Sequence, residues 1–479
     1  MTVRTRFAPS PTGYMHLGGL RTALYAYLFA KKHGGKFLLR IEDTDLARFV
    51  DGATEVIYET LKSCGILWDE GPDIGGPCGP YIQSERKASY APLALRLIES
   101  GHAYRCFCGK DELETQRLQA QQRGETFKYD KRCKHLSGEE VAERLARGEE
   151  HVVRFDMPTS GETAFDDLVF GRIVTPNDTL DDIILIKADG MPTYNFANVI
   201  DDHLMGISHV MRGMEYLSST PKYNLIYEAF GWEIPQYIHL TLIMRDQNHK
   251  LSKRDGDAYF SDFIEKGYLK EAIVNYLVLL GWNPGTEEEF FTIEELVRAF
   301  DASGLSKSPA IFDGQKLRWF NAEYIRRLSP EGFLKEALPW YEKAGVAGMD
   351  AEILRRILQP RVEIFSELPE MVDFLTEMPE FTSELYFHKK MKTDAALAKT
   401  VLLALEPKLS ALTPFGEESL HALLIAHAEE GGLKNGQVMW PLRVALSGKA
   451  VTPGGAVEIA ALLGKEEALR RLRLSLAAL

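Results

Sequence analysis

Residues Arg6–Gly19 read RFAPSPTGYMHLGG and lead directly into LRTALYAYLFAKK. The quoted stretch contains two prolines, a serine, a threonine and three glycines around a single histidine. The run Thr5–Ala8 is compatible with a β-strand, and the apolar residues of 20–31 recur with the spacing of a helix. This order of strand, glycine- and proline-rich loop and helix predicts the first unit of an open α/β sheet, whose ligands bind beyond the carboxyl ends of its strands.

The loop itself is suited to hold a phosphate group. A helix that starts directly after it offers unpaired N–H groups and the positive end of the helix dipole. Gly18 and Gly19 have no Cβ, so a ligand can approach the backbone closely, and the His16 ring can donate an N–H to a phosphoryl oxygen. Spacing alone also fits a purely structural turn with an exposed histidine, so both interpretations stay open at this point.

Length and composition describe a multidomain globular protein. The chain has 479 residues, 45% of them hydrophobic and 26% charged, and no apolar run reaches the ~18–20 residues that a membrane span needs. The start, MTVRTRFAPSP, lacks the apolar core of a secretory signal. We therefore expect a cytoplasmic protein without a membrane partner. The net charge of -13 does not exclude nucleic acid, because such binding needs only a local basic surface.

A second stretch, 246–258, reads DQNHKLSKRDGDA, which alone is typical of a solvated basic loop. Together the two stretches resemble the two signatures of class I aminoacyl-tRNA synthetases. PSPTGYMHLGG resembles the first signature in the form that glutamyl-tRNA synthetases use, with glycine where many class I enzymes have a second histidine. KLSKR resembles the second, lysine-rich signature.

The resemblance implies a site for ATP with Mg²⁺ on its phosphates. The residues implied to be catalytic are His16, Gly18, Gly19, Lys250, Ser252 and Lys253, and those implied to bind ATP are Pro9, His16, Glu215 and Lys253. When an amino-acid carboxylate attacks the α-phosphate, negative charge develops on the departing pyrophosphate. Lysines beside that group stabilise the transition state more than the ground state, so positioning and electrostatics suffice without a covalent nucleophile.

The amino-acid pocket is predicted from a second strand and a later segment. The run KFLLRIEDTD ends in carboxylates, which are costly to bury unless they face a ligand or a partner. Asp43 and Asp45 fit a capped turn, whereas Glu42 is the better candidate to hold an ammonium group. The resemblance implies these substrate-binding residues: Arg6, Ala8, Ser10, Glu42, Tyr194, Asn198 and Arg212.

Arg212 predicts which amino acid is bound. A guanidinium pairs in a bidentate way with a carboxylate but gives a neutral amide no counter-charge. The related glutaminyl enzymes have no arginine at that position, so the resemblance implies L-glutamate as the substrate.

Three of the five cysteines lie in one short window, as Cys106-Phe-Cys108 and Cys133-Lys-His135. Thiolates and an imidazole suit tetrahedral zinc, and the odd cysteine count argues against a disulfide framework. We predict one structural Zn²⁺ per chain, with free intracellular thiols as the alternative. The fourth ligand is His135 or Tyr129, since a phenolate replaces the histidine in related proteins.

The resemblance covers essentially the whole chain and implies an α/β fold. It consists of a class I Rossmann-type catalytic domain with an inserted acceptor-binding domain, followed by an all-α anticodon-binding domain. We expect the catalytic halves at 1–105 and 191–245, the insertion with its zinc knuckle at 106–190, a connecting stem-contact domain with the KLSKR loop at 246–324, and the helical anticodon domain at 325–479. In this last domain Arg361 is the candidate anticodon reader, and Arg470, Arg471 and Arg473 are expected to form a basic face.

The implied function is ATP-dependent activation of L-glutamate to glutamyl-adenylate, followed by transfer to the 3′ end of tRNA(Glu). The resemblance also implies that tRNA is bound before activation, and we expect a monomer. A glutamyl-queuosine tRNA synthetase is less suited, because it lacks the anticodon domain. The intact His16, Glu42, Arg212 and Lys253 argue against an inactive RNA-binding paralogue. Whether tRNA(Gln) is also charged stays open.

Overall fold

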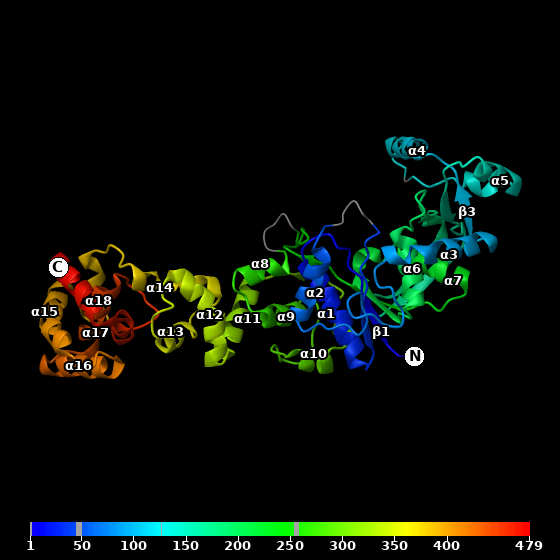
Figure 1. Ribbon diagram of the computed structural model, residues 1–479. Coiled ribbons are helices and arrows are strands. Elements are labelled where there is room, and N and C mark those ends of the chain that lie inside the picture. The colour runs from blue at the N-terminus through cyan, green and yellow to red at the C-terminus, as the bar shows by residue number, and fades with distance from the viewer. Residues whose placement is uncertain (1, 45–49, 126, 253–257) are drawn as a thin grey trace. The chain divides into compact units, whose positions relative to one another are not determined.

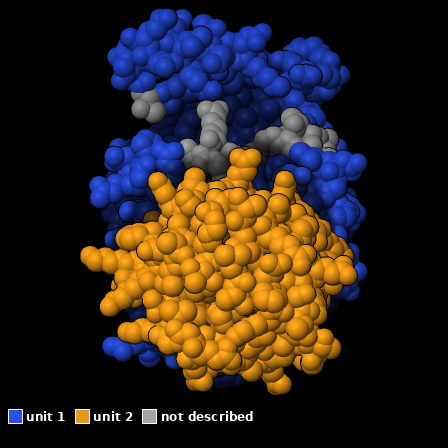
Figure 2. All heavy atoms as spheres, turned by 90° about the vertical axis from the view of Figure 1, so that its left-hand side faces the viewer, with its two compact units in different colours: residues 1–262, 274–313 blue, residues 263–273, 314–479 orange. Residues whose placement is uncertain are grey.

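The structure is a computed structural model that describes residues 2–44, 50–125, 127–252 and 258–479 (Figure 1). The chain forms two compact units, coloured separately in Figure 2. Unit 1 comprises Met1–Asp262 with Val274–Asp313, and unit 2 comprises Phe263–Ile273 with Gly314–Leu479. Among the described helices, none is both long and apolar enough to cross a membrane.

Unit 1 begins with the predicted strand, loop and helix. Strand β1 (Arg4–Phe7) pairs in parallel with β2 (Lys36–Leu39), and α1 (Leu17–Lys32) connects them. Helix α1 starts three residues earlier than its apolar spacing indicates, because the ring nitrogen Nδ1 of His16 accepts a hydrogen bond from the backbone N–H of Gly18 and so caps the helix.

The main sheet has the strand order β6-β5-β9-β8. Its strands are β5 (Glu162–Asp167), β6 (Gly171–Pro176), β8 (His209–Gly213) and β9 (Gln236–Leu240). Strand β9 runs parallel to both β8 and β5, while β5 and β6 form an antiparallel hairpin. The backbone N–H of Ser208 donates to the carbonyl of Arg4 at 3.0 Å, so β8 begins beside β1. Two helices, α6 (Tyr194–Leu204) and α7 (Thr220–Phe230), accompany these strands.

A second, three-stranded antiparallel sheet has the order β3-β4-β7. It consists of β3 (Ala103–Cys106), β4 (Val152–Phe155) and β7 (Ile184–Ile186), with the 3₁₀ turn η3 (Arg132–His135) and helices α3 (Lys87–Glu99), α4 (Lys110–Gln122) and α5 (Gly138–Ala146) in the same region. Tyr104, Cys106, Tyr129 and Cys133 form a small buried cluster of their own. The remaining elements described in unit 1 include α2 (Ala53–Ser63), β10 (Ile243–Met244), α10 (Ile293–Ala299) and β11 (Ala310–Ile311).

Unit 2 is helical, as the sequence predicts. Beyond residue 313 its helices are α11 (Gly314–Arg327), α12 (Pro330–Ala344), α13 (Ala351–Leu358), α14 (Leu368–Thr376), α15 (Ala395–Ala411), α16 (Glu417–Glu430), α17 (Asn435–Ser447) and α18 (Ala456–Ala478) (Figure 1). Apolar side chains from these helices share one core. Helices α8 (Phe260–Glu265) and α9 (Lys270–Leu279) complete the described helices of the chain.

The expected basic face at the end of the chain is wrong for Arg471. This side chain is fully buried, and its guanidinium donates to the carbonyl oxygens of Leu446 at 2.9 Å and Leu375 at 3.0 Å. Both carbonyls lie at the C-terminal ends of helices, where backbone acceptors have no partner within the helix. Arg471 therefore has a structural role, whereas Arg470 and Arg473 lie at the surface and pair with glutamates.

Candidate active site

A cavity of about 600 Å³ opens at the carboxyl ends of β1, β8 and β9, beside the N-terminus of α1. Both signature stretches contribute to it, since His16 and Lys250 line the same cavity. The predicted site residues that line it are Arg6, Ala8, Ser10, His16, Gly18, Gly19, Glu42, Tyr194, Arg212, Glu215 and Lys250. The fold thus gathers residues from four distant parts of the chain around one space.

Three predicted residues that the structure describes lie outside the lining, namely Pro9, Asn198 and Ser252. Pro9 contributes its carbonyl, which accepts from the backbone N–H of Glu42 at 3.0 Å. Asn198 is buried in α6, where its Nδ2 donates to the carbonyl of Tyr194 at 2.7 Å. These two residues therefore hold lining residues in place. Lys253 lies outside the described residues.

The His16 ring is oriented by its capping role. Its Nδ1 accepts from the Gly18 N–H at 3.1 Å, so the proton of the neutral ring is on Nε2. A ring held in this way offers an N–H donor at the start of α1, where the helix dipole also favours an anion.

Gly18 and Gly19 are not required by the protein's own packing. Both have negative φ, and a Cβ built on either would meet its nearest neighbours, the Nδ1 of His16 and the Sδ of Met15, at ordinary contact distances of 3.4 Å and 3.5 Å. Both residues line the cavity, where the absence of a Cβ is compatible with the close approach of a ligand.

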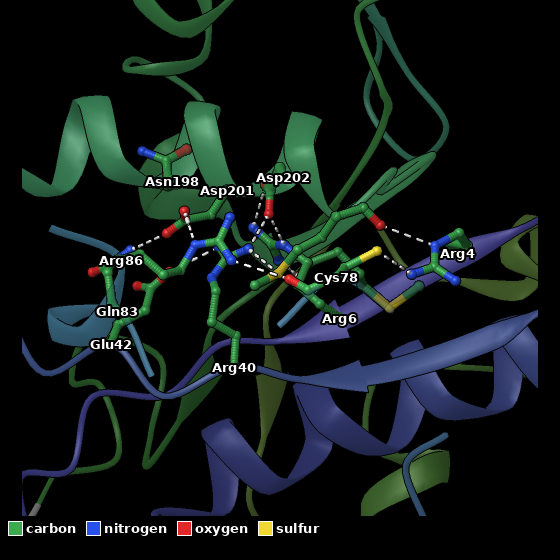
Figure 3. Close-up of polar contacts among 12 residues, drawn as sticks. Arg4, Arg6, Arg40, Glu42, Cys78, Gln83, Arg86, Asn198, Asp201 and Asp202 are labelled. Carbon is green, nitrogen blue, oxygen red and sulfur yellow. Dashed lines mark hydrogen bonds and ion pairs between the residues drawn. The ribbon is translucent and has the colours of Figure 1, made fainter. Parts of the chain in front are cut away.

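Charged side chains form a buried network (Figure 3), and two of its members, Arg6 and Glu42, line the cavity. The Asp202 carboxylate accepts from Nε of Arg6 at 3.0 Å, from Nη2 of Arg6 at 3.1 Å and from Nη1 of Arg40 at 2.7 Å. Arg40 continues the network, because its Nη2 donates to Oε1 of Glu42 at 2.9 Å. Burial opposes the charge of Asp202, but Arg6 and Arg40 lower the pKa of its carboxyl below the usual value. The positive charge of Arg6 is therefore already matched inside the protein.

Glu42 is the carboxylate that this network presents to the cavity. Burial raises its pKa, and the charge of Arg40 and its hydrogen bond act against that shift. A cationic ligand group beside Glu42 would favour the ionised form further. The geometry therefore fits the predicted role in holding an ammonium group.

Arg212 differs from Arg6 in its partners. Its Nε donates to Nε2 of His239 at 3.2 Å and its Nη2 to Oγ1 of Thr220 at 2.8 Å, so both acceptors belong to side chains without a negative charge. Among the described residues it forms no salt bridge, although it is only 5% exposed. Its guanidinium also lies 4.8 Å from the ring centroid of Tyr223 and 5.2 Å from that of Tyr216. Arg212 is thus a buried cation at the cavity wall that a carboxylate could match.

Comparisons with known proteins agree with this arrangement. Residues 2–319 match the family described as "tRNA synthetases class I (E and Q), catalytic domain", and residues 321–476 match "Anticodon binding domain". The chain is 54% identical over 473 residues to a glutamate–tRNA ligase from Clostridium botulinum, covering 98% of both chains. It is 55% identical over 476 residues to the same enzyme from Clostridium tetani, covering 99% of this chain and 97% of the relative.

This chain belongs to the glutamate–tRNA ligase family. A crystal structure of a glutamate–tRNA ligase from Elizabethkingia meningosepticum in complex with its amino acid is similar over 100% of both chains, with a TM-score of 0.90 and 36% identity. The predicted fold class is therefore confirmed, as a class I catalytic domain followed by a helical anticodon-binding domain. Membership in class I implies ATP and Mg²⁺.

The cysteine cluster is assembled without His135. The Sγ atoms of Cys106, Cys108 and Cys133 all lie within 4.8 Å of one another. The phenol oxygen of Tyr129 lies 3.2 Å from Sγ of Cys106 and 3.3 Å from Sγ of Cys108, whereas His135 is exposed and does not belong to the cluster. In the 3₁₀ turn η3 there are three residues per turn, so side chains two positions apart point in different directions.

The cluster has the chemistry of a metal site. Burial raises the pKa of Cys108 to about 12, and the neighbouring sulfurs add to that shift. Two buried thiols, one half-buried thiol and a phenol at these distances repel one another once deprotonated, and a divalent cation would remove that repulsion. These four donors therefore fit a tetrahedral zinc ion.

Sequence reasoning missed several residues that line or support the cavity. Thr22, Thr44, Tyr216 and Thr241 belong to the lining. Arg40 and Asp202 support other lining residues, and Arg40 is a buried charge that directly follows the apolar run of β2, which is the signal that could have identified it. Arg361 is exposed in the turn after α13, where its Nη1 donates to the carbonyl of Ile357, and its role stays a prediction.

Proposed function

We propose that this chain activates L-glutamate with ATP to give glutamyl-adenylate and pyrophosphate, and transfers the glutamyl group to the 3′ end of tRNA(Glu). The observation that carries the proposal is Arg212, a buried cation with neutral partners at the wall of a cavity that His16 and Lys250 also line. Family membership supports the reaction.

In the proposed reaction ATP lies with its phosphates at the start of α1. His16 Nε2–H and the backbone beside Gly18 and Gly19 face the triphosphate, and Lys250 with Lys253 stabilises the negative charge that develops on the leaving pyrophosphate. Mg²⁺ bound to the phosphates would share this charge. The α-carboxylate of glutamate attacks the α-phosphate directly, so the catalytic contribution comes from orientation and electrostatics.

Glutamate is held through two of its charged groups. Glu42 accepts from the ammonium group, and Arg212 pairs with the side-chain carboxylate, while Arg6 and Tyr194 bound the space between them. Glutamine would leave the Arg212 guanidinium desolvated without a counter-charge, which costs several kcal/mol in a buried setting, on the order of 3–5. Selection for glutamate thus follows from the unmatched charge of Arg212.

We also propose a structural zinc ion held by Cys106, Cys108, Cys133 and Tyr129. Bound by these residues, zinc would cross-link β3, η3 and the segment that precedes η3, in a region whose buried apolar cluster is small. This region, within 106–190, is the proposed binding site for the acceptor arm of the tRNA. Arg361 in the helical domain is proposed to contact the anticodon. We further propose a cytoplasmic monomer, as expected from the sequence.

The test is ATP–pyrophosphate exchange with L-glutamate in the presence and absence of tRNA(Glu), followed by charging of tRNA(Glu) and tRNA(Gln). We expect glutamate-dependent exchange and charging of tRNA(Glu), and no exchange with glutamine. Arg212→Gln should abolish the preference for glutamate while leaving ATP binding intact. A wild-type protein that binds tRNA without any exchange would overturn the proposal in favour of a binding protein.

A further inference from the structure

Three neighbouring strands place three polar side chains side by side, with Arg212 at the cavity wall. Asp167 is the last residue of β5, His239 lies in β9, and Arg212 lies in β8. In the parallel register Arg212 pairs with His239, and Asp167 pairs with the residue two positions before His239. All three are buried, since Asp167 is 4% exposed, His239 is 0% exposed and Arg212 is 5% exposed. A buried polar row of this kind needs a hydrogen-bond partner for each member.

The protons of this row can be assigned from its donors and acceptors. Oδ2 of Asp167 lies 2.7 Å from Nδ1 of His239 and also accepts from the His239 backbone N–H at 3.0 Å. Oδ1 accepts from the backbone N–H groups of Val169 and Phe170, both at 2.9 Å. Asp167 is therefore an acceptor at both oxygens, so Nδ1 of His239 is the protonated nitrogen and Nε2 has a free lone pair.

That lone pair faces Arg212. Nε of Arg212 lies 3.2 Å from Nε2 of His239 and can only donate, so a proton on Nε2 would place two donors against each other. The hydroxyl of Thr220 donates to the carbonyl of Tyr216 at 2.8 Å, which leaves its oxygen to accept from Nη2 of Arg212. The Arg212 guanidinium is thus held at two of its three nitrogens by neutral acceptors.

The surroundings keep His239 neutral. Burial lowers its pKa, and although Asp167 acts in the opposite direction, the positive charge of Arg212 lowers it further. The other groups around it are Thr220 from α7 at 3.3 Å, the ring of Tyr237 from its own strand at 5.9 Å, and the carboxylate of Glu215, whose charge also acts on the ring.

We propose that His239, fixed by Asp167, is the positioning residue for Arg212 and sets the angle at which the outer N–H groups of Arg212 meet the side-chain carboxylate of the substrate. The inference rests on the proposed function and deepens it.

The choice of histidine has a physical reason that Arg6 makes clear. Arg6 is oriented by a carboxylate, and its charge is matched by Asp202. The same arrangement at Arg212 would match its charge before the substrate arrives, and glutamate would then compete with an internal anion. A neutral imidazole accepts a hydrogen bond from the Nε–H of Arg212. It therefore fixes the guanidinium without matching its positive charge, which remains available to the ligand. Asp167, one step further away, fixes the imidazole and its tautomer.

Two substitutions of His239 separate the two hydrogen bonds. His239→Gln places an amide oxygen near the position of Nε2 and keeps an acceptor for Arg212. His239→Asn places an amide nitrogen near the position of Nδ1 and keeps the donor for Asp167, but removes the acceptor for Arg212. Thr163→Val is the matched control, because it removes a buried 2.6 Å hydrogen bond to Asn177 from β5 of the same sheet without touching this row.

We expect the Asn variant to raise the KM for glutamate by at least about tenfold, because a small misplacement of a binding group has effects of this size or larger. The Gln variant should stay within about threefold of wild type, and the KM for ATP should be unchanged in both. The Asn variant should also lose part of the preference for glutamate over glutamine. Thr163→Val should leave all these values unchanged.

Asp167→Asn gives a second measurement if His239→Asn does not fold. Its amide would turn a donor toward Nδ1 and favour the other tautomer, with Nε2–H facing Arg212, so the KM for glutamate should rise as well. Equal KM values for the Gln and Asn variants, or a loss of kcat alone, would overturn the positioning role. A wild-type protein that does not bind glutamate in calorimetry would instead overturn the proposed function, and this inference with it.

Discussion

Replacing Asp202 by asparagine tests whether the buried network of charges holds the site together. The Asp202 carboxylate accepts three hydrogen bonds from two guanidinium groups, at 3.0, 3.1 and 2.7 Å. Arg6, Arg40 and Asp202 are all at most 4% exposed. Asparagine keeps the shape, but it has one acceptor oxygen, turns an N–H₂ group toward a donor and carries no charge.

The expected cost follows from what is left behind. Removing one partner of a buried ion pair costs about 3–5 kcal/mol, since the remaining charge is buried and uncompensated. Here two guanidinium groups lose their shared counter-ion, and only Arg40 retains another, Glu42 at 2.9 Å. We therefore expect the upper part of that range, about 4–5 kcal/mol, which is a large fraction of the roughly 5–15 kcal/mol that stabilises a typical domain.

The assay is hydrogen exchange of α6 (Tyr194–Leu204), the helix that carries Asp202, together with urea unfolding of the whole chain. The control is Glu114→Gln in α4, which breaks an ion pair whose two side chains are 57% and 64% exposed and should cost less than about 1 kcal/mol. The same Asp202→Asn protein should show a raised KM for glutamate, because Arg6 and, through Arg40, Glu42 lose their fixed positions. If Asp202→Asn shifts the opening free energy of α6 no more than the control does, the reasoning about this network is refuted.

Three further substitutions test separate parts of the site. Gly18→Ala should leave stability unchanged or raise it by up to about 1 kcal/mol, because glycine is unfavourable in a helix. The same substitution should raise the KM for ATP by about tenfold or more. An unchanged KM for ATP would show that the cavity does not need the glycine. Tyr129→Phe should weaken zinc binding by on the order of 100-fold in a chelator competition, with His135→Ala as the control that leaves binding unchanged; the reverse result would make His135 the ligand. His239→Gln should also lessen the loss of stability on acidification. The pKa of His239 in the folded protein lies below its unfolded value of about 6.5, so the unfolded chain binds a proton that the folded chain does not as the pH falls through about 6.5. This proton binding lowers the free energy of unfolding by at most about 1.4 kcal/mol per pH unit. Identical pH–stability curves for the variant and the wild type would contradict this.

The loop and helix of the catalytic unit could be predicted because their information is local. The prolines and glycines of 6–19 end β1 and start α1, and only the first turn of α1 was missed. That turn depends on His16 as an N-cap, and histidine is not among the residues that usually signal one. The helical character of unit 2 was predictable for the same reason, since apolar spacing is a property of neighbouring residues.

The supporting network of the site was not predictable, because its members are far apart in the sequence. Arg40 and Asp202 are 162 positions apart, and Asp167 and His239 are 72 positions apart. A polar or charged residue in or next to a buried strand indicates that some partner exists, as His239 in β9 and Arg40 directly after β2 do, but only the three-dimensional arrangement shows which residue that partner is. The fourth donor of the cysteine cluster was not predictable from the sequence either. The fold places the phenol oxygen of Tyr129 beside the sulfurs, whereas His135 in η3 is exposed and lies outside the cluster.

The two arginines at the cavity show how a fold can assign different tasks to the same side chain. Both are buried, so both lose hydration, and each needs compensation. Arg6 receives it from an anion and becomes a fixed, neutralised part of the wall. Within the described part of the chain, Arg212 has only neutral acceptors and aromatic rings as partners, with centroids at 4.8, 5.2 and 5.4 Å, which stabilise the cation without matching its charge. A carboxylate that enters the cavity therefore gains the most binding free energy at Arg212, and an amide in that place gains little. Discrimination between glutamate and glutamine thus depends on Arg212 having no counter-ion among the described residues.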